Sequence, residues 1–260
     1  MSDSQPQYDG YILDLDGTVY RGDQLISGAQ ERIAWLREAG SQVVFLSNKP
    51  LDPRANYAAK LTRLGIPTPS EDVINSTQAL FYHLRQENQR EHLFVIGEPA
   101  LLREFQAEGF TLTTSLPDIR VVIAAFDRTL DYAKLDLAHQ ALIRGARFYA
   151  TNPDRTCPMA DGELPDCAGV IAFLEATTAR KVEFIAGKPS PGILQAALTH
   201  LGIPRERCLM VGDRLATDIQ MGLALGLDTA LVLTGVTSRE SLATSHLRPT
   251  YVLESISFVP

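Results

Sequence analysis

The sequence predicts an α/β protein in which helices cover a largely parallel β-sheet. Two observations support this fold class: short apolar segments rich in β-branched and aromatic residues recur along the 260-residue chain, and helix-length amphipathic segments alternate with them. The third observation is that no linker or change of composition divides the chain into two domains. A second domain would therefore have to be inserted within the first.

The strands are predicted from apolar runs and the helices from amphipathic periodicity. The predicted strands are 11–15, 43–46, 73–74, 93–96, 121–126, 148–150, 184–186, 208–211 and 229–233. The predicted helices are 29–39, 53–64, 77–86, 99–108, 132–144, 168–176, 191–201 and 216–225. In the first helix Ala29, Ile33 and Leu36 share one face, and Gly40 can terminate it. The turn-rich segment 151–166 is expected to be a loop.

Composition excludes several classes of function. Lys and Arg number 24 against 31 Asp and Glu, a net charge of −7, which is not the basic footprint of a nucleic-acid-binding protein. The longest strongly apolar run, 121–126, is too short to cross a membrane, and the first ten residues do not resemble a signal peptide. The three cysteines match no metal motif and indicate reduced thiols. We therefore expect a cytoplasmic protein that binds neither nucleic acid nor membrane.

Polar motifs follow several predicted strands, and in open α/β sheets ligands bind beyond the carboxyl ends of strands. In the first motif, Asp14 closes a strand and Asp16 lies two residues later, before Gly17. A strand period of two would return both carboxylates to one side. Such a pair can bind a hard cation or divide the roles of nucleophile and acid. An acidic turn is the alternative interpretation.

The second and third motifs supply groups that can hold a phosphate. Ser47 and Asn48 follow a strand and offer a hydroxyl and an amide. Lys188 follows another strand between Gly187 and Pro189, which would make it a fixed positive charge. The alternatives are a Ser/Asn turn and a solvated loop lysine.

The fourth motif is a pair of acids near the carboxyl end of a later strand. Asp213 directly follows the apolar strand 208–211 and its glycine, and Asp218 comes five residues later. Asp213 is a candidate metal ligand. The alternative is that Asp213 or Thr217 caps the following helix.

This ordered set of motifs resembles the haloacid-dehalogenase-like (HAD) superfamily of aspartate-nucleophile phosphatases. D-x-D-G-T, the strand-end Ser, G-K-P and G-D-x-x-x-x-D all match. The spacing resembles the NagD-like and 4-nitrophenylphosphatase-like subfamily, in which a cap domain lies between the second and third motifs. The resemblance implies a Rossmann-like parallel-sheet core from 1–77 and 187–260, with a smaller α/β cap inserted at 78–186.

The resemblance also implies roles for the core residues in phosphate-ester hydrolysis. Asp14 would attack the phosphorus and form an aspartyl-phosphate, and Asp16 would protonate the leaving group. Ser47 and Lys188, with Asn48 nearby, would bind and stabilise the transferring phosphoryl group.

Mg²⁺ is the cofactor that this mechanism implies, because carboxylates facing a phosphate dianion need a cation. The expected ligands are Asp14, the backbone carbonyl of Asp16, and Asp213. Asp218 is expected to hold a ligand or water around the ion.

Selectivity is expected to reside in the cap. Asn152 and Arg155 lie on the polar, turn-rich loop 151–166 that follows a cap strand, and they are candidate substrate-binding residues. Residues 149–154 are similar to the subfamily's cap segment. A structural turn with a solvated Arg155 is the alternative. Two departures from the subfamily are Lys49, an extra cation, and the segment 165–169. Some members of the subfamily form dimers through the cap, so the resemblance is compatible with a homodimer through the cap, and the sequence itself does not decide the oligomeric state.

The expected substrate is a small phosphorylated metabolite. Two other functions are compatible with the motifs: phosphoryl transfer to an acceptor other than water, as in a phosphomutase, and non-catalytic sensing of a phosphometabolite. The presence of both Asp14 and Asp16 favours an enzyme over a sensor.

Overall fold

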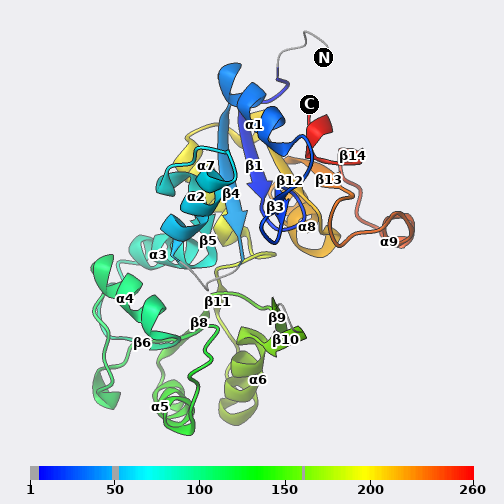
Figure 1. Ribbon diagram of the computed structural model, residues 1–260. Helices are drawn as coiled ribbons and strands as arrows, with labels where there is room; N and C mark the ends of the chain where they lie inside the picture. Colours follow the sequence, from blue (N-terminus) through cyan, green and yellow to red (C-terminus); the bar gives the residue numbers. More distant parts are fainter. Residues whose placement is uncertain (1–5, 49–52, 160–161) are drawn as a thin grey trace. The chain divides into compact units, whose positions relative to one another are not determined.

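A computed structural model describes residues 6–48, 53–159 and 162–260. They form two compact units, each with its own sheet (Figure 1). The first unit contains the described residues up to Ser47 together with 54–74 and 188–260, and the second contains the described residues of 48–53 together with 75–187. Residues 75–187 thus form a folded body inserted into the chain of the first unit.

The first unit is built on a sheet with strand order β14-β13-β12-β1-β4-β5. The strands are β1 (Gly10–Asp14), β4 (Gln42–Ser47), β5 (Val73–Asn75), β12 (Cys208–Gly212), β13 (Asp228–Val232) and β14 (Tyr251–Leu253). All pairings from β14 to β4 are parallel. Every residue of the inner strand β1 is buried, as expected for a parallel strand covered on both faces. A small hairpin, β2 (Tyr20–Arg21) and β3 (Gln24–Leu25), follows β1.

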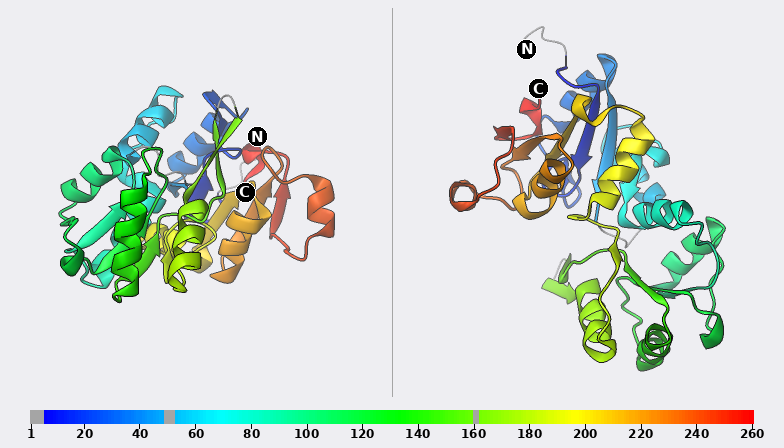
Figure 2. Two further views of the ribbon diagram at one scale, coloured as in Figure 1. Left: turned by 90° about the horizontal axis from the view of Figure 1, so that it is seen from below. Right: turned by 180° about the vertical axis from the view of Figure 1, so that it is seen from behind.

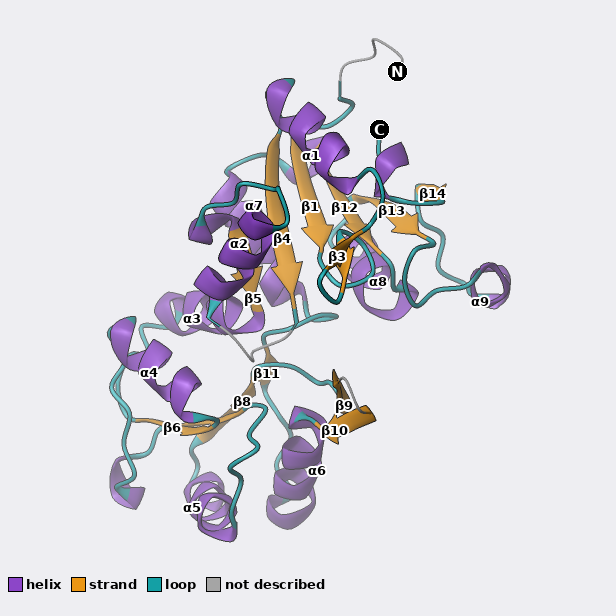
Figure 3. Ribbon diagram, in the orientation of Figure 1, coloured by secondary structure: helices purple, strands orange, loops and turns teal. Residues whose placement is uncertain are grey.

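Helices lie on both faces of this sheet (Figure 3). On one face Ile33 and Leu36 of α1 (Ala29–Glu38) and Leu61 of α2 (Arg54–Arg63) pack into a cluster with strand residues such as Leu13 and Phe45. The other helices of this unit are α7 (Pro191–Leu201), which contacts β4, α8 (Gln220–Ala224), which contacts β13, and α9 (Arg239–Thr244). This arrangement leaves the carboxyl ends of the strands to carry the polar motifs.

The second unit is a smaller parallel sheet with strand order β11-β8-β7-β6. Its strands are β6 (Leu93–Ile96), β7 (Val121–Ala124), β8 (Arg147–Ala150) and β11 (Phe184–Ile185). Its helices are α3 (Ser76–Gln86), α4 (Pro99–Ala107), α5 (Tyr132–Ile143) and α6 (Cys167–Thr178). Leu142 of α5 and Leu174 of α6 pack with Phe148 of the sheet. Figure 2 shows that α5 and α6 cover the same face.

The expected loop at 151–166 is wrong in its second half. This segment contains an antiparallel hairpin of β9 (Thr156–Met159) and β10 (Gly162–Pro165). The Asp161-Gly162 dipeptide is a hairpin signal that predicts such a turn, although residues 160 and 161 lie outside the described part. The strand β14 and helix α9 also went unpredicted, because three- and six-residue elements give too little periodicity to detect.

The three cysteines are buried in the structure. Cys157, Cys167 and Cys208 are free and buried, and burial raises the pKa of Cys167 to about 12 and that of Cys208 to about 11. A thiol must ionise to act as a nucleophile or metal ligand, so neither of these two is suited to that chemistry. In the described part of the chain, no helix is long and apolar enough to span a membrane.

Candidate active site

The strand register of the first unit brings three predicted residues to one edge of the sheet. Asp14, the last residue of β1, pairs with Leu46 on β4, so Ser47 lies one residue beyond that pairing. On its other side β1 pairs with β12, which ends immediately before Asp213. Because parallel strands end at the same edge, these side chains meet there. All three are buried.

Lys188 lies in the middle of this cluster and links two carboxylates. Its ammonium donates to Oδ1 of Asp14 and to Oδ1 of Asp218, the latter at 2.8 Å. The three residues are 5%, 6% and 0% exposed, respectively. The Thr18 hydroxyl donates to the other oxygen of Asp14 at 3.3 Å. Buried charges need this degree of pairing, so the solvated-lysine interpretation is excluded.

The contact between Lys188 and the two carboxylates favours the protonated, positively charged form of Lys188. Burial raises the pKa of Asp14 to about 7, against the opposing effect of the Lys188 ammonium, and the carboxylates of Asp218 and Asp213 add to the rise. Burial alone would lower the pKa of Lys188, but the two contacting carboxylates outweigh burial and raise it. Lys188 is therefore the charged cation of the site, and Asp14 can be ionised near neutral pH.

The donor set fits a hard divalent cation. Carboxylate oxygens of Asp14, Asp213 and Asp218 lie within 4.8 Å of one another. In Asp213, Oδ2 accepts a hydrogen bond from the backbone N–H of Val236 at 2.6 Å, whereas Oδ1 is buried and has no hydrogen-bond partner. An unpartnered buried carboxylate oxygen is costly, and a cation would satisfy it. An all-oxygen set is the kind that Mg²⁺ prefers.

Asp218 differs from Asp213 because both of its oxygens are engaged. Oδ1 contacts Lys188, and Oδ2 accepts from the backbone N–H of Arg214 at 3.1 Å. This geometry arises in a π-helical turn, Leu215–Ile219, which precedes α8 in the predicted helix 216–225. No side-chain cap is present at its start, so neither Asp213 nor Thr217 serves as the helix cap. Asp218 is built into the support of the cluster.

Asp16 lies just beyond β1 rather than within it. The strand ends at Asp14, and Asp16 forms an isolated bridge with Tyr20. Strand periodicity therefore does not position it. The side chain is half-buried, and in the described part of the chain the carboxylate cluster does not include it. Gly17, with φ of +90°, turns the chain directly after it, a conformation that glycine adopts without strain.

The other predicted binding residues belong to the second unit. The amide of Asn48 donates to Asp154 at 3.0 Å. Asn152 is completely buried, and its side-chain oxygen accepts from the backbone N–H of Asp154 at 3.0 Å. Arg155 is exposed. Lys49 lies outside the described residues. Asn48 and Asn152 thus meet around Asp154 within the second unit.

Sequence reasoning missed the loop that follows β13. Residues 234–237, Thr-Gly-Val-Thr, directly follow the predicted strand 229–233, and the backbone of Val236 binds Asp213. The same rule that selected the other motifs, polar or glycine residues after a buried strand, applies to this segment.

Fold and site together define an α/β enzyme with a carboxylate–lysine centre at the ends of parallel strands. Comparison with protein-family models gives two matches: residues 11–111 match a haloacid dehalogenase-like hydrolase, and residues 185–258 match a HAD-hydrolase-like model. The chain belongs to the HAD-like hydrolase family.

This chain is similar to known phosphatases over nearly its whole length. It is 38% identical to the sugar-phosphatase AraL of Bacillus subtilis, covering 96% of this chain and 91% of that protein. It is 33% identical to the ribonucleotide monophosphatase NagD of Escherichia coli, covering 95% and 96%. The structure of a 4-nitrophenylphosphatase from Thermotoga maritima aligns with a TM-score of 0.90 at 35% identity, covering 96% and 95%. The protein is a hydrolase that acts on phosphoric monoester bonds.

Proposed function

We propose that this protein is a Mg²⁺-dependent phosphatase that hydrolyses a small phosphate monoester, a sugar phosphate or similar metabolite, through an aspartyl-phosphate on Asp14. The observation that carries the proposal is the buried Lys188 held between Asp14 and Asp218. A phosphate dianion and a carboxylate repel one another strongly in a buried site. A fixed ammonium beside the carboxylate lowers that repulsion where the two must meet.

In the first step an oxygen of Asp14 attacks the phosphorus as the bond to the leaving oxygen breaks. Asp16 gives its proton to that oxygen, so an alcohol departs. The half-buried position of Asp16 outside the carboxylate cluster suits this role, because solvent reaches Asp16 more readily than it reaches the buried Asp14.

In the second step water attacks the phosphorus of the aspartyl-phosphate, and Asp16 takes the proton of that water. The bond from phosphorus to the Asp14 oxygen breaks, which releases phosphate and regenerates the carboxylate. Ser47, buried next to Asp14 at the end of β4, and Lys188 would stabilise charge on the phosphoryl oxygens in both steps.

The residues that would hold Mg²⁺ are Asp14, Asp213 and the backbone carbonyl of Asp16. Bound there, the ion would supply positive charge against the phosphoryl oxygens. The unpartnered Oδ1 of Asp213 supports its role as a direct ligand. The two engaged oxygens of Asp218 support a role around the ion rather than on it.

The names of the relatives support a small metabolite as substrate. They include a sugar-phosphatase, a dihydroxyacetone phosphatase and a ribonucleotide monophosphatase. We assign the first unit as the catalytic core and the second unit as the cap that discriminates among such esters, because the core motifs can bind only the phosphoryl group that all of them share.

The substrate-binding roles of Asn152 and Arg155 can be separated by experiment. Asn152 is buried and hydrogen-bonded within its own turn, whereas Arg155 is exposed. Arg155→Ala should change relative kcat/KM among natural phosphate esters by about tenfold, equivalent to about 1.4 kcal/mol, with little effect on 4-nitrophenyl phosphate. Equal losses on every substrate for Asn152→Ala would assign Asn152 to folding of the turn.

We further propose a cytoplasmic homodimer that forms through the second unit. The free, buried cysteines fit a reducing compartment. Light scattering of the purified protein tests the dimer, and a monomer at micromolar concentration would contradict it.

The direct test of the proposed function is turnover of 4-nitrophenyl phosphate. We expect activity with Mg²⁺, loss of activity in chelator, and loss of at least about 10⁴-fold in Asp14→Asn, since a nucleophile is removed. Mass spectrometry of acid-quenched enzyme should show phosphate on Asp14. Binding of phosphate esters without turnover would favour a sensor, and transfer to an added alcohol in place of water would favour a phosphotransferase.

A further inference from the structure

The backbone of the loop that follows β13, residues 234–237, donates two hydrogen bonds to Asp213. The N–H of Val236 donates to Oδ2 of Asp213 at 2.6 Å, and the N–H of Thr237 donates to the carbonyl oxygen of Asp213 at 3.1 Å. The side chain and the main chain of Asp213 are therefore both held by this loop. Only Oδ1 is left without a hydrogen-bond partner.

Two glycines allow the backbone to approach this carboxylate from both sides. A Cβ on Gly235 would lie 1.8 Å from Oδ2 of Asp213, and a Cβ on Gly17 would lie 2.7 Å from the same atom. The Cβ of Gly17 would also come within 3.0 Å of the Cα of Gly235. Any side chain at either position would displace the carboxylate, so these contacts determine where Asp213 points.

Thr234 connects the same loop to the turn that follows Asp14. Its hydroxyl donates to the carbonyl oxygen of Gly17 at 2.6 Å, and the N–H of Gly17 donates to the carbonyl oxygen of Tyr20 at 2.8 Å. The peptide groups on both sides of Gly17 are therefore held. The first of these groups contains the carbonyl of Asp16, and a planar peptide fixes that carbonyl opposite to the held N–H.

The carbonyl oxygen of Thr234 is anchored in turn. The guanidinium of Arg21, on β2, donates to it, and the N–H of Leu233 donates to Leu253 of β14 at 2.9 Å. The loop is thus tied to the hairpin on one side and to the sheet on the other. An anchored loop can hold both Asp213 and Gly17 in fixed positions.

We propose that residues 234–237 form the positioning element of the cation site and that Thr234 is its key positioning residue. By holding Asp213 and the carbonyl of Gly17, the residue directly after Asp16, the loop constrains the distance between two of the groups that would bind Mg²⁺. The inference rests on the proposed function, because it concerns the cation that the phosphatase reaction needs.

A structural role alone would have different consequences. If the loop only connects β13 to β14, loss of the Thr234 hydroxyl would lower stability and leave affinity for Mg²⁺ unchanged. If the loop positions ligands, affinity for Mg²⁺ would fall even where the protein remains folded. Groups that orient metal ligands are worth about 10- to 100-fold in metal affinity.

The test is Mg²⁺ binding by the full-length chain, measured by isothermal titration calorimetry and by the rise in melting temperature on addition of Mg²⁺. Thr234→Val keeps the shape and removes the hydroxyl, and we expect Mg²⁺ affinity to fall about 10- to 100-fold. Thr234→Ser restores the hydroxyl and should recover most of the affinity. Thr234→Ala gives a second variant if valine prevents folding.

Thr250→Val is the matched control in the same unit. Thr250 is exposed, and its hydroxyl accepts from the N–H of Thr229 and donates to Asp228, at 3.1 and 3.0 Å. This variant should leave Mg²⁺ affinity unchanged. Equal Mg²⁺ affinity in Thr234→Val, Thr234→Ala and the unmodified protein would overturn the inference alone. Failure of the unmodified protein to bind Mg²⁺ would instead overturn the proposed cofactor.

Discussion

The two units share an architecture, and each has a network of charged residues at the end of strands: the carboxyl ends in the first unit, and the amino ends of β8 and β11 in the second. In the first unit, Asp14, Ser47 and Asp213 lie at or just after the carboxyl ends of parallel strands. In the second unit, Arg147 is the first residue of β8 and Glu183 immediately precedes β11, so the network around Arg147 lies at the amino ends of these two strands.

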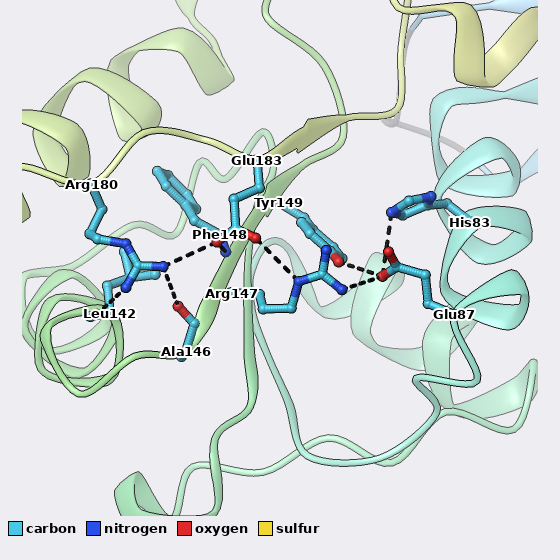
Figure 4. A network of polar contacts seen from close by, with 9 residues as sticks. All are labelled: His83, Glu87, Leu142, Ala146, Arg147, Phe148, Tyr149, Arg180 and Glu183. Carbon is cyan, nitrogen blue, oxygen red and sulfur yellow. Dashed lines mark hydrogen bonds and ion pairs between the residues drawn. The ribbon is translucent and has the colours of Figure 1, made fainter.

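The network of the second unit is extensive and partly solvated (Figure 4). Arg147 donates to Glu87 at 2.6 Å and to Glu183 at 3.2 Å, and the Tyr149 hydroxyl donates to Glu87 at 2.5 Å. The side chain of Arg147 is 44% exposed and that of Glu87 is 27% exposed. The site of the first unit is almost completely buried by comparison.

The difference in exposure changes the chemistry of similar groups. Burial raises the pKa of Asp14 despite the contact with Lys188. Burial acts in the same direction on Glu87, but the hydrogen bonds from Tyr149 and Arg147 prevail and lower its pKa. Glu87, whose charged form is stabilised, is suited to a structural role. Asp14, which burial keeps near its ionisation point, is suited to catalysis.

The largest effect should come from breaking the buried ion pair. Lys188→Met leaves the buried carboxylates unpaired, and we expect a loss of about 3–5 kcal/mol of stability in chelator. Trp35, the single tryptophan, lies in the first unit, so its fluorescence during urea unfolding reports on that unit. The control is Arg239→Met in the same unit, whose ion pair with Glu254 has both side chains 65% exposed. An equal loss in both variants would refute the distinction.

Removal of the proposed acid should affect rate and leave binding intact. Asp16→Asn should lower kcat by about 10²–10⁴-fold, with unchanged affinity for Mg²⁺ because the backbone carbonyl of Asp16 remains. Steady-state kinetics and calorimetry check the two parts. The control is Asp23→Asn at an 84% exposed side chain, and a normal kcat in Asp16→Asn would exclude this residue as the acid.

A buried carboxyl in the second unit gives a pH prediction. Burial raises the pKa of Asp166 from 3.8 to about 6. Between those values the native state holds a proton that the unfolded state releases, so stability should fall as the pH rises through this window, by about 2–3 kcal/mol.

Asp166→Asn tests this pH dependence with the cap of α6 retained. The Asp166 side chain accepts from the N–H of Cys167, and an amide oxygen can accept that bond as well. Urea unfolding followed by far-ultraviolet circular dichroism from pH 3.5 to 7.5 should show the decline in the parent and a flatter curve in the variant. Parallel curves would contradict the prediction.

The smallest effect should come from the exposed network. Arg147→Met should cost no more than about 1 kcal/mol of stability, because solvent screens half-exposed ion pairs, and it should leave kcat/KM unchanged. Hydrogen exchange at β8 measures the first quantity and turnover the second. The difference in stability between Arg147→Met and the unmodified protein should be smaller at high salt. A large loss of activity would mean that the network acts on the site.

The active-site motifs could be predicted from the sequence because their positions follow from local pattern. A buried parallel strand is a short apolar run, and the residue after it is at the sheet edge wherever the strand lies in the sheet. Asp14, Ser47 and Asp213 could be found in this way. The hairpin of β9 and β10 was missed because two four-residue strands have little periodicity of their own.

Contacts between distant parts of the chain fix which oxygens of these carboxylates are hydrogen-bonded and which are left to bind a cation. That Oδ1 of Asp213 is unpartnered and Oδ2 is bound depends on Val236, 23 residues away along the chain. That Lys188 joins Asp14 depends on a contact across 174 residues. Hydrogen bonds between distant segments form only when the sheet has assembled, so no local pattern records them. Local sequence pattern is enough to place these chemical groups at the edge of the sheet, whereas their orientation and charge depend on hydrogen bonds between distant segments.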